Sequence, residues 1–114
     1  MSSDCLFCKI VAGEIDTKKV KETETVLAFE DINPAAPTHV LVIPKKHITS
    51  AADLTRGDGD LLGEIFEVAA GVAESAGVGE GYRVVTNVGS RAGQSVFHIH
   101  FHVIGGRDFS WPPG

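Results

Sequence analysis

Residues 97–103 alternate strictly between apolar side chains and histidine. Successive side chains of a β-strand point to opposite sides of its sheet, so this pattern predicts a strand with two different faces. Four apolar residues belong on the core face: Phe97, Ile99, Phe101 and Val103. Three histidines share the other face: His98, His100 and His102. Because residues two apart on a strand lie roughly 7 Å from each other, neighbouring imidazoles can converge on one small ligand.

The remaining segments predict a sheet with one long helix. Five segments have the composition of strands: 18–21, 26–29, 40–43, 82–88 and 96–104. The segment 40–43 is continuously apolar, which is typical of a strand buried on both faces, and the last two segments predict a hairpin. A short helix is expected within 5–15, ending near Gly13. These elements predict the α+β class with a five-stranded antiparallel sheet.

An apolar stripe at helical spacing predicts the long helix over 58–76. Its members are Leu61, Leu62, Ile65, Phe66, Ala69, Val72, Ala73 and Ala76. The segment 55–58 fits a capping box at the start of the helix, and Gly77 is placed for a left-handed cap at its end. Four small residues allow a second helix to approach closely: Ala69, Ala70, Gly71 and Ala73.

Length and charge narrow the class of protein. The 114 residues suit one domain, 1–114, and the net charge of −5 disfavours a nonspecific nucleic-acid or membrane-surface binder. No apolar stretch approaches the length of a membrane span, and residues 1–4 lack the features of a secretory signal. Cys5 and Cys8 are too few and too close together for a disulfide framework. We expect a cytoplasmic protein without a nucleic-acid or membrane partner.

The spacing of the three aligned histidines leaves three interpretations open. The first is a solvated or hydrogen-bonded histidine face. The second is a metal site, because two imidazoles two residues apart on a strand can bind zinc. The third is catalysis by imidazole itself, which is a nucleophile and a proton carrier near neutral pH.

The turn before the histidines, residues 87–95, also has two interpretations. Its backbone N–H groups can form an anion-binding nest for a phosphate. Gly89 and Gly93 are equally expected of an ordinary hairpin turn. Ser95 lacks the Gly-x-Ser-x-Gly context of a serine hydrolase, which makes that class less suitable.

The run 98–104 matches the signature of the histidine triad family, three histidines that alternate with apolar residues. Other segments resemble the family in the same order along the chain: 5–10, 29–34, 36–48, 93–96 and 111–114. The closing Trp-Pro-Pro-Gly is the most specific of them to one branch. The chain therefore resembles the nucleotide-binding, phosphoramidase-like branch of the family over nearly its whole length.

The resemblance implies the histidine triad fold, a homodimer whose sheet extends across both subunits, and a purine nucleoside phosphoramidase. The enzyme would convert adenosine 5′-phosphoramidate-type substrates into nucleoside monophosphate and amine. His100 would attack the α-phosphorus, and water would hydrolyse the nucleotidyl-histidine without any required cofactor. The alternatives are a nucleotide-binding regulatory or scaffold protein with little turnover, a dinucleoside polyphosphate hydrolase, and a metal-dependent hydrolase on the three aligned histidines.

The resemblance also implies roles for residues around His100. The catalytic neighbours would be His39, Ser95, His98 and His102. The nucleotide would be bound by Asp31 at the ribose, Ile32 at the base, and Asn87, Gly93, Gln94, Ser95, His100 and His102. Three of these residues also fit ordinary roles, in which Asp31 caps a turn, Asn87 ends a strand and His39 lies in the core.

Cys5 and Cys8 form half of a zinc site by their spacing, and reduced structural cysteines near a helix are a common alternative explanation. Some similar bacterial-type members complete the site with two histidines. The matching positions are His47 and His98. The resemblance therefore implies a structural zinc that ties the N-terminal helix to the sheet.

Overall fold

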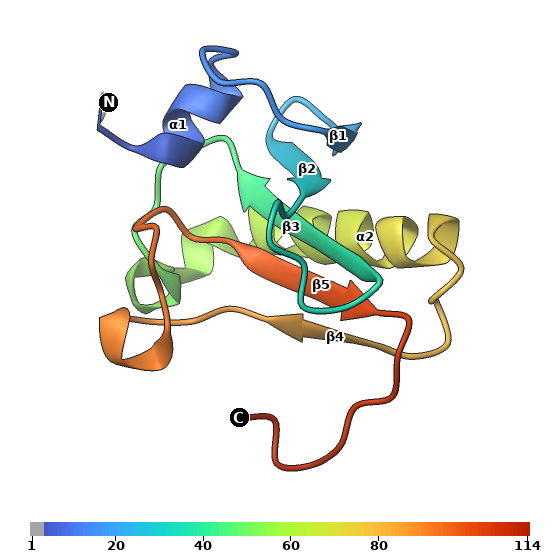
Figure 1. Ribbon diagram of the computed structural model, residues 1–114. Coiled ribbons are helices and arrows are strands. Elements are labelled where there is room, and N and C mark those ends of the chain that lie inside the picture. Colours follow the sequence, from blue (N-terminus) through green and yellow to red (C-terminus); the bar gives the residue numbers. More distant parts are fainter. Residues whose placement is uncertain (1–3) are drawn as a thin grey trace.

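A five-stranded antiparallel sheet lies at the centre of the computed structural model, which describes residues 4–114 (Figure 1). The strands are β1 (Lys19–Glu22), β2 (Val26–Glu30), β3 (Thr38–Pro44), β4 (Tyr82–Val85) and β5 (Phe101–Gly105). Their order in the sheet is β1-β2-β3-β5-β4, so β4 and β5 form the predicted hairpin. The α+β class and the five-stranded antiparallel sheet are confirmed. Residues 1–3, which belong to the segment judged to lack a secretory signal, lie outside the described residues.

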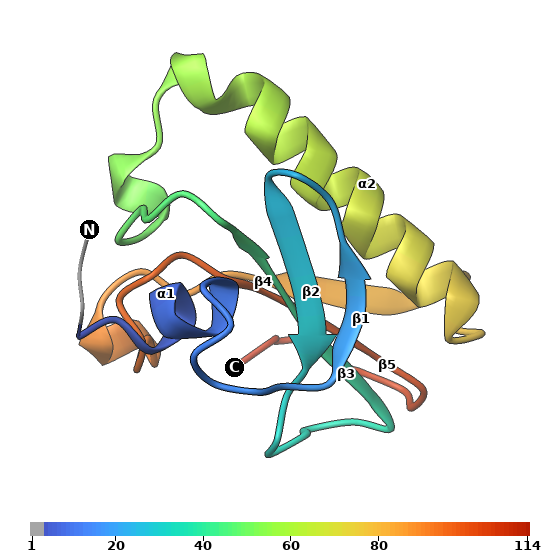
Figure 2. The ribbon, with the colours of Figure 1, turned by 90° about the horizontal axis from the view of Figure 1, so that it is seen from above.

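Two helices pack on opposite faces of the sheet. They are α1 (Leu6–Val11) and α2 (Gly59–Ser75), and α2 runs along one whole face (Figure 2). Strand β2 shows the division, because Val26 and Ala28 pack with α2 while Leu27 and Phe29 pack with α1. Strand β3 is buried on both faces over residues 40–44, as its continuous apolar sequence predicts. Within residues 4–114, no helix is long and apolar enough to cross a membrane.

The final strand is shorter than the alternation predicts, because β5 begins at Phe101 rather than at residue 96. Before that point the N–H of Ile99 donates to the carbonyl of Ile48, which lies beyond the end of β3. Ile99 and Phe101 are buried on the α2 side as expected, but Phe97 is 48% exposed and does not belong to the core. The predicted strand 82–88 is likewise shorter, since β4 ends at Val85.

The boundaries of α2 follow the predicted caps closely. Gly77 has a φ of +80°, and the N–H of Val78 donates to the carbonyl of Ala73 at 2.9 Å, which is a Schellman cap. At the other end the N–H of Thr55 donates to the Asp58 carboxylate at 2.9 Å. A 3₁₀ turn, Arg56–Asp58, therefore comes before the α-helix itself.

Two details of the predicted helix faces are wrong. Phe66 is 49% exposed at the edge of the apolar stripe, and Val68, which the stripe omitted, is buried. Ala69 and Ala73 lie in the core against the sheet, whereas Ala70 and Gly71 are exposed. The four small residues therefore do not form one outward surface for a second helix.

Candidate active site and metal centre

Two histidines from neighbouring strands form a chain of hydrogen bonds on the α1 side of the sheet. Nε2 of His39 on β3 lies 2.9 Å from Nδ1 of His102 on β5. The N–H of Ala35 donates to Nδ1 of His39 at 2.9 Å. The proton of a neutral His39 is therefore on Nε2, from which it is donated to His102. The proton of His102 is then on Nε2, the nitrogen that remains free for a ligand.

Asp31 lies at the end of this chain. Its Oδ2 is 3.4 Å from Nε2 of His39, and its Oδ1 accepts the N–H of Asn33 at 2.8 Å. The carboxylate therefore caps the turn after β2, as its ordinary role predicts, and also lies beside the histidines. Ile32, the next residue, is 87% exposed. Contacts of Asp31 and Ile32 with a ribose and a base remain predictions.

His100 has the complementary arrangement, with a lone pair on its free nitrogen. Its Nδ1 donates to the carbonyl of His98 at 2.8 Å, so Nε2 is unprotonated in the neutral ring. The Phe7 ring packs perpendicular to the His100 ring at a centroid distance of 5.0 Å. Thr86 donates its hydroxyl to the His100 carbonyl at 2.8 Å. His100 and His102 are adjacent, with ring centroids 5.1 Å apart.

Burial determines the charge of His102. Burial, followed by the neighbouring His100 and His39, lowers the pKa of His102 to about 4, whereas Asp31 opposes the shift. A His102 ring with this pKa is neutral at physiological pH. It can then donate a hydrogen bond from Nε2 without carrying a positive charge.

The pKa of His102 predicts a pH dependence of stability. An unfolded histidine titrates near pH 6.5, so between pH 6.5 and about 4 the unfolded state binds more protons than the folded state. The free energy of unfolding is therefore expected to decrease as the pH falls through this range, by about 1–2 kcal/mol after solvent screening is allowed for. His102→Asn retains an acceptor for His39 and should lack this contribution. Urea unfolding of both proteins between pH 7 and 4 measures the difference, and parallel pH profiles would contradict the assignment.

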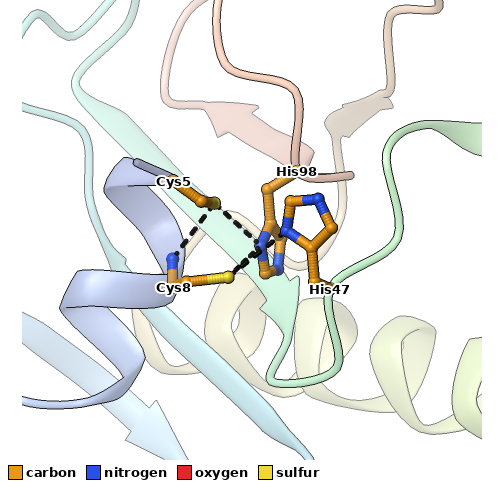
Figure 3. Close-up of side chains that lie close together, drawn as sticks. All are labelled: Cys5, Cys8, His47 and His98. Atoms are coloured by element: carbon orange, nitrogen blue, oxygen red, sulfur yellow. Dashed lines mark hydrogen bonds between the residues drawn. The ribbon is translucent and has the colours of Figure 1, made fainter. Parts of the chain in front are cut away.

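Four side chains from three separate segments lie close together (Figure 3). Cys5 and Cys8 come from α1 and its N-cap, His47 from the loop after β3, and His98 from the segment before β5. The sulfurs of Cys5 and Cys8 lie 3.4 and 3.5 Å from Nδ1 of His98, and the sulfur of Cys8 lies 3.3 Å from Nδ1 of His47. The structure thus brings together all four residues of the implied metal set.

The geometry of this cluster fits zinc. A tetrahedral zinc with Zn–S bonds of about 2.3 Å and Zn–N bonds of about 2.0–2.1 Å holds sulfur and nitrogen about 3.5 Å apart. Nε2 of His98 donates to the carbonyl of Pro44 at 2.8 Å, so the lone pair on Nδ1 faces the sulfurs. Burial and the neighbouring Cys5 raise the pKa of Cys8 to about 11, so a cation is required to stabilise its thiolate.

Hydrogen bonds to the backbone argue against a metal held by the three aligned histidines. The Nδ1 atoms of His98 and His100 face different partners, the cysteine sulfurs and the His98 carbonyl. A second group of possible ligand atoms, on Asp31, His39 and His102, also lies within 4.8 Å. There the Ala35 N–H occupies Nδ1 of His39 and places the proton on Nε2, so Nε2 has no lone pair for a metal.

The turn between β4 and β5 is stabilised mainly by its own hydrogen bonds. The backbone N–H groups of Gly93 and Gln94 donate to the carbonyls of Ser90 and Gly89. The Gln94 side chain, which is buried, accepts the N–H of Gly89 and donates to the carbonyls of Thr49 and Val96. Gln94 therefore has a structural role, and the contacts of Gly93 and Gln94 with a nucleotide remain predictions.

The backbone donors left for a phosphate are fewer than the sequence predicts. Among residues 4–114, no acceptor is found for the N–H groups of Ser95 and Val96. Ser95 is exposed, so its hydroxyl is also accessible. The half-buried Asn87 lies against the turn, with its Nδ2 3.8 Å from the position of a Cβ on Gly93.

The sequence did not indicate the residues that support these rings. Phe7, which packs on both His98 and His100, has one available signal, its position between the two cysteines. Thr86 and the carbonyl of Pro44 have none, because a main-chain hydrogen bond leaves no trace in residue type. Both can be identified only from the structure.

The fold and the site define a small α+β protein with a buried imidazole, whose Nε2 carries a lone pair, beside a cysteine–histidine centre. The profile of the HIT domain, named for the histidine triad, matches residues 12–109, so the chain belongs to the HIT domain family. A HIT family hydrolase from Legionella pneumophila Philadelphia 1 is 52% identical, with a TM-score of 0.95 over 97% of this chain and 100% of that one.

Two curated relatives extend the comparison to other organisms. A HIT-like protein from Synechocystis is 47% identical over the full length of both chains. A 14 kDa zinc-binding protein from Zea mays is 48% identical over 98% of this chain and 89% of its own. The name of the maize protein agrees with the zinc-compatible geometry of the cluster.

Proposed function

We propose that this protein is a purine nucleoside phosphoramidase that forms a nucleotidyl intermediate on His100. The observation that carries the proposal is the pair of fixed tautomers, an Nε2 lone pair on His100 beside an Nε2–H donor on His102. Nucleophilic catalysis needs the first, and a phosphoryl oxygen that gains charge needs the second. Membership of the HIT family and the hydrolase from Legionella support the same reaction class.

The proposed reaction has two displacement steps at phosphorus. In the first, Nε2 of His100 bonds to the α-phosphorus while the P–N bond to the leaving amine breaks. The amine takes a proton that is relayed from water through the Ser95 hydroxyl. In the second, a water oxygen attacks phosphorus, the bond to His100 breaks, and the proton of the water returns through Ser95. One water is consumed, and nucleoside monophosphate and amine are released.

Neutral residues surround the phosphate in this scheme. Nε2–H of His102 and the free N–H groups of Ser95 and Val96 would donate to the phosphoryl oxygens. Such preorganised donors stabilise developing negative charge without bulk positive charge, which suits a chain whose net charge is −5. Zinc, when bound by Cys5, Cys8, His47 and His98, supplies a crosslink between α1 and the segments around the sheet and no reaction chemistry.

A homodimer belongs to the same proposal. Strand β4 is an edge of the sheet, and its four residues are half-buried. Phe66 lies exposed on α2 and contacts Phe101 of β5. Within residues 4–114 β4 has a neighbouring strand on one side only, and together with the exposed ring on the helix that packs against β5 this supports pairing of β4 with a second copy. The molecular mass of the protein in solution distinguishes a monomer from a homodimer.

The test of the proposed function is hydrolysis of adenosine 5′-phosphoramidate by the purified protein. We expect AMP and ammonia in equal amounts, and a nucleotidyl adduct on His100 after quenching in alkali, where the phosphorus–histidine bond survives. A parallel assay with diadenosine tetraphosphate should show much slower turnover. Tight AMP binding without hydrolysis of either compound would contradict the proposal and favour a regulatory nucleotide-binding protein.

A further inference from the structure

We infer that the cysteine–histidine centre positions the nucleophile, His100, from outside the active site. The inference rests on the proposed function only for the role of His100. The evidence for it lies at His98, because this residue belongs to both sites. Its ring lies in the metal centre, and its carbonyl oxygen accepts the Nδ1–H of His100 at 2.8 Å.

The His98 ring is held at both nitrogens. Nδ1 faces the sulfurs of Cys5 and Cys8 at 3.4 and 3.5 Å, and Nε2 donates to the carbonyl of Pro44 at 2.8 Å. The residue is fully buried, so its backbone moves with its ring. A metal bound to Nδ1 replaces weak contacts with thiols by a bond of defined length. Metal binding therefore fixes the carbonyl that orients His100.

Phe7 supplies a second connection between the two sites. It lies between Cys5 and Cys8 in α1, and its ring packs edge-on against His98 at 6.0 Å and His100 at 5.0 Å. The helix has only six residues, and isolated helices of that length are not stable. Its position depends on side-chain anchors, to which a metal on the two cysteines would add. The metal therefore holds the aromatic ring that packs against His100.

The expected kinetic effect is on the chemical step. Attack on phosphorus requires Nε2 of His100 to be in line with the leaving group, and small misplacements reduce such rates strongly. The proposed nucleotide contacts at Asp31 and Ile32 are on the loop after β2, outside the metal centre. Loss of the metal should therefore lower kcat and leave KM nearly unchanged.

The test is the double variant Cys5→Ser/Cys8→Ser. Serine at position 5 retains an acceptor for the N–H of residue 8, which the Cys5 sulfur accepts at 3.3 Å, so the cap of α1 survives. We expect the zinc content to fall from one ion per chain to none, and kcat to fall about ten- to hundredfold with less than a twofold change in KM. In the wild-type protein His100 Nδ1 should give a single ¹⁵N resonance at the shift of a protonated nitrogen. In the double variant we expect this single resonance to be lost. Leu6→Ser, an exposed position on the same helix, should leave all three unchanged.

If the double variant fails to fold, a second measurement on the wild-type protein tests the inference. The His100 Nδ1 resonance of the wild-type protein is recorded before chelation, after chelation and after zinc is restored, with circular dichroism as the check on folding. A reversible change supports the inference. Metal-free protein that keeps both its kcat and this resonance would overturn it. Because the resonance does not require turnover, a protein without phosphoramidase activity would contradict the proposed function and still test the positioning.

Discussion

Replacement of His100 by alanine is expected to lower kcat for adenosine phosphoramidate hydrolysis by about a thousandfold or more. The change removes the only imidazole whose Nε2 lone pair is both fixed and adjacent to the His102 donor, among residues 4–114. No nucleotidyl adduct should form. Steady-state kinetics and intact-protein mass spectrometry after an alkaline quench measure the two effects.

The control for this variant is His100→Asn. The asparagine amide can donate to the His98 carbonyl as Nδ1 of His100 does, so the hydrogen bond is retained while the nucleophile is lost. Both variants should still bind AMP, with affinity reduced only by the loss of the His100 contact, which separates loss of chemistry from loss of folding. Unchanged turnover in either variant would eliminate His100 as the nucleophile.

Replacement of Gln94 by alanine is expected to lower the free energy of unfolding by about 2–4 kcal/mol. Gln94 is 3% exposed, and its amide satisfies three main-chain groups, the N–H of Gly89 and the carbonyls of Thr49 and Val96. Alanine leaves all three without this partner and loosens the turn that carries Ser95. Guanidinium unfolding measures the loss of stability, and phosphoramidase assays should show a fall in kcat.

Two further variants test whether the loss of stability comes from the Gln94 amide. Gln94→Glu retains an acceptor for Gly89 but places a carboxylate against two carbonyls, so it should be at least as unstable as the alanine variant. Arg91→Ala, at an exposed position in the same turn, should have little effect. A Gln94→Ala protein as stable as the wild type would show that water replaces the amide in all three hydrogen bonds.

The alternation of residues 97–103 predicted the faces of the last strand better than its length. Side-chain direction depends on local backbone geometry, whereas a strand ends where its hydrogen bonds to the neighbouring strand stop. The last pair of β3 and β5 is Val42 and Phe101. Beyond it, the carbonyl of Pro44 accepts a hydrogen bond from the His98 ring, and the N–H of Ile99 donates to the carbonyl of Ile48. These long-range partners leave no periodic signal in the sequence.

In the candidate site, too, the residues could be predicted from the sequence but their main-chain hydrogen bonds could not. The sequence resemblance predicted all four members of the cysteine–histidine cluster, because each is a residue type with its own chemistry. The protonation pattern could not be predicted, since it depends on the N–H of Ala35 and the carbonyl of His98. The same limit applied to Gln94, whose amide could face a ligand or the chain itself until its partners were known.

Main-chain anchoring of the imidazoles has a consequence for how the protein tolerates mutation. The N–H of Ala35 and the carbonyls of Pro44 and His98 set which nitrogen of His39, His98 and His100 carries a proton. A substitution at position 35 or 44 changes a side chain and leaves these groups in place, with proline at position 35 as the exception because it has no N–H. Mutations can therefore change the residues next to the site without changing which nitrogen of each imidazole carries the proton.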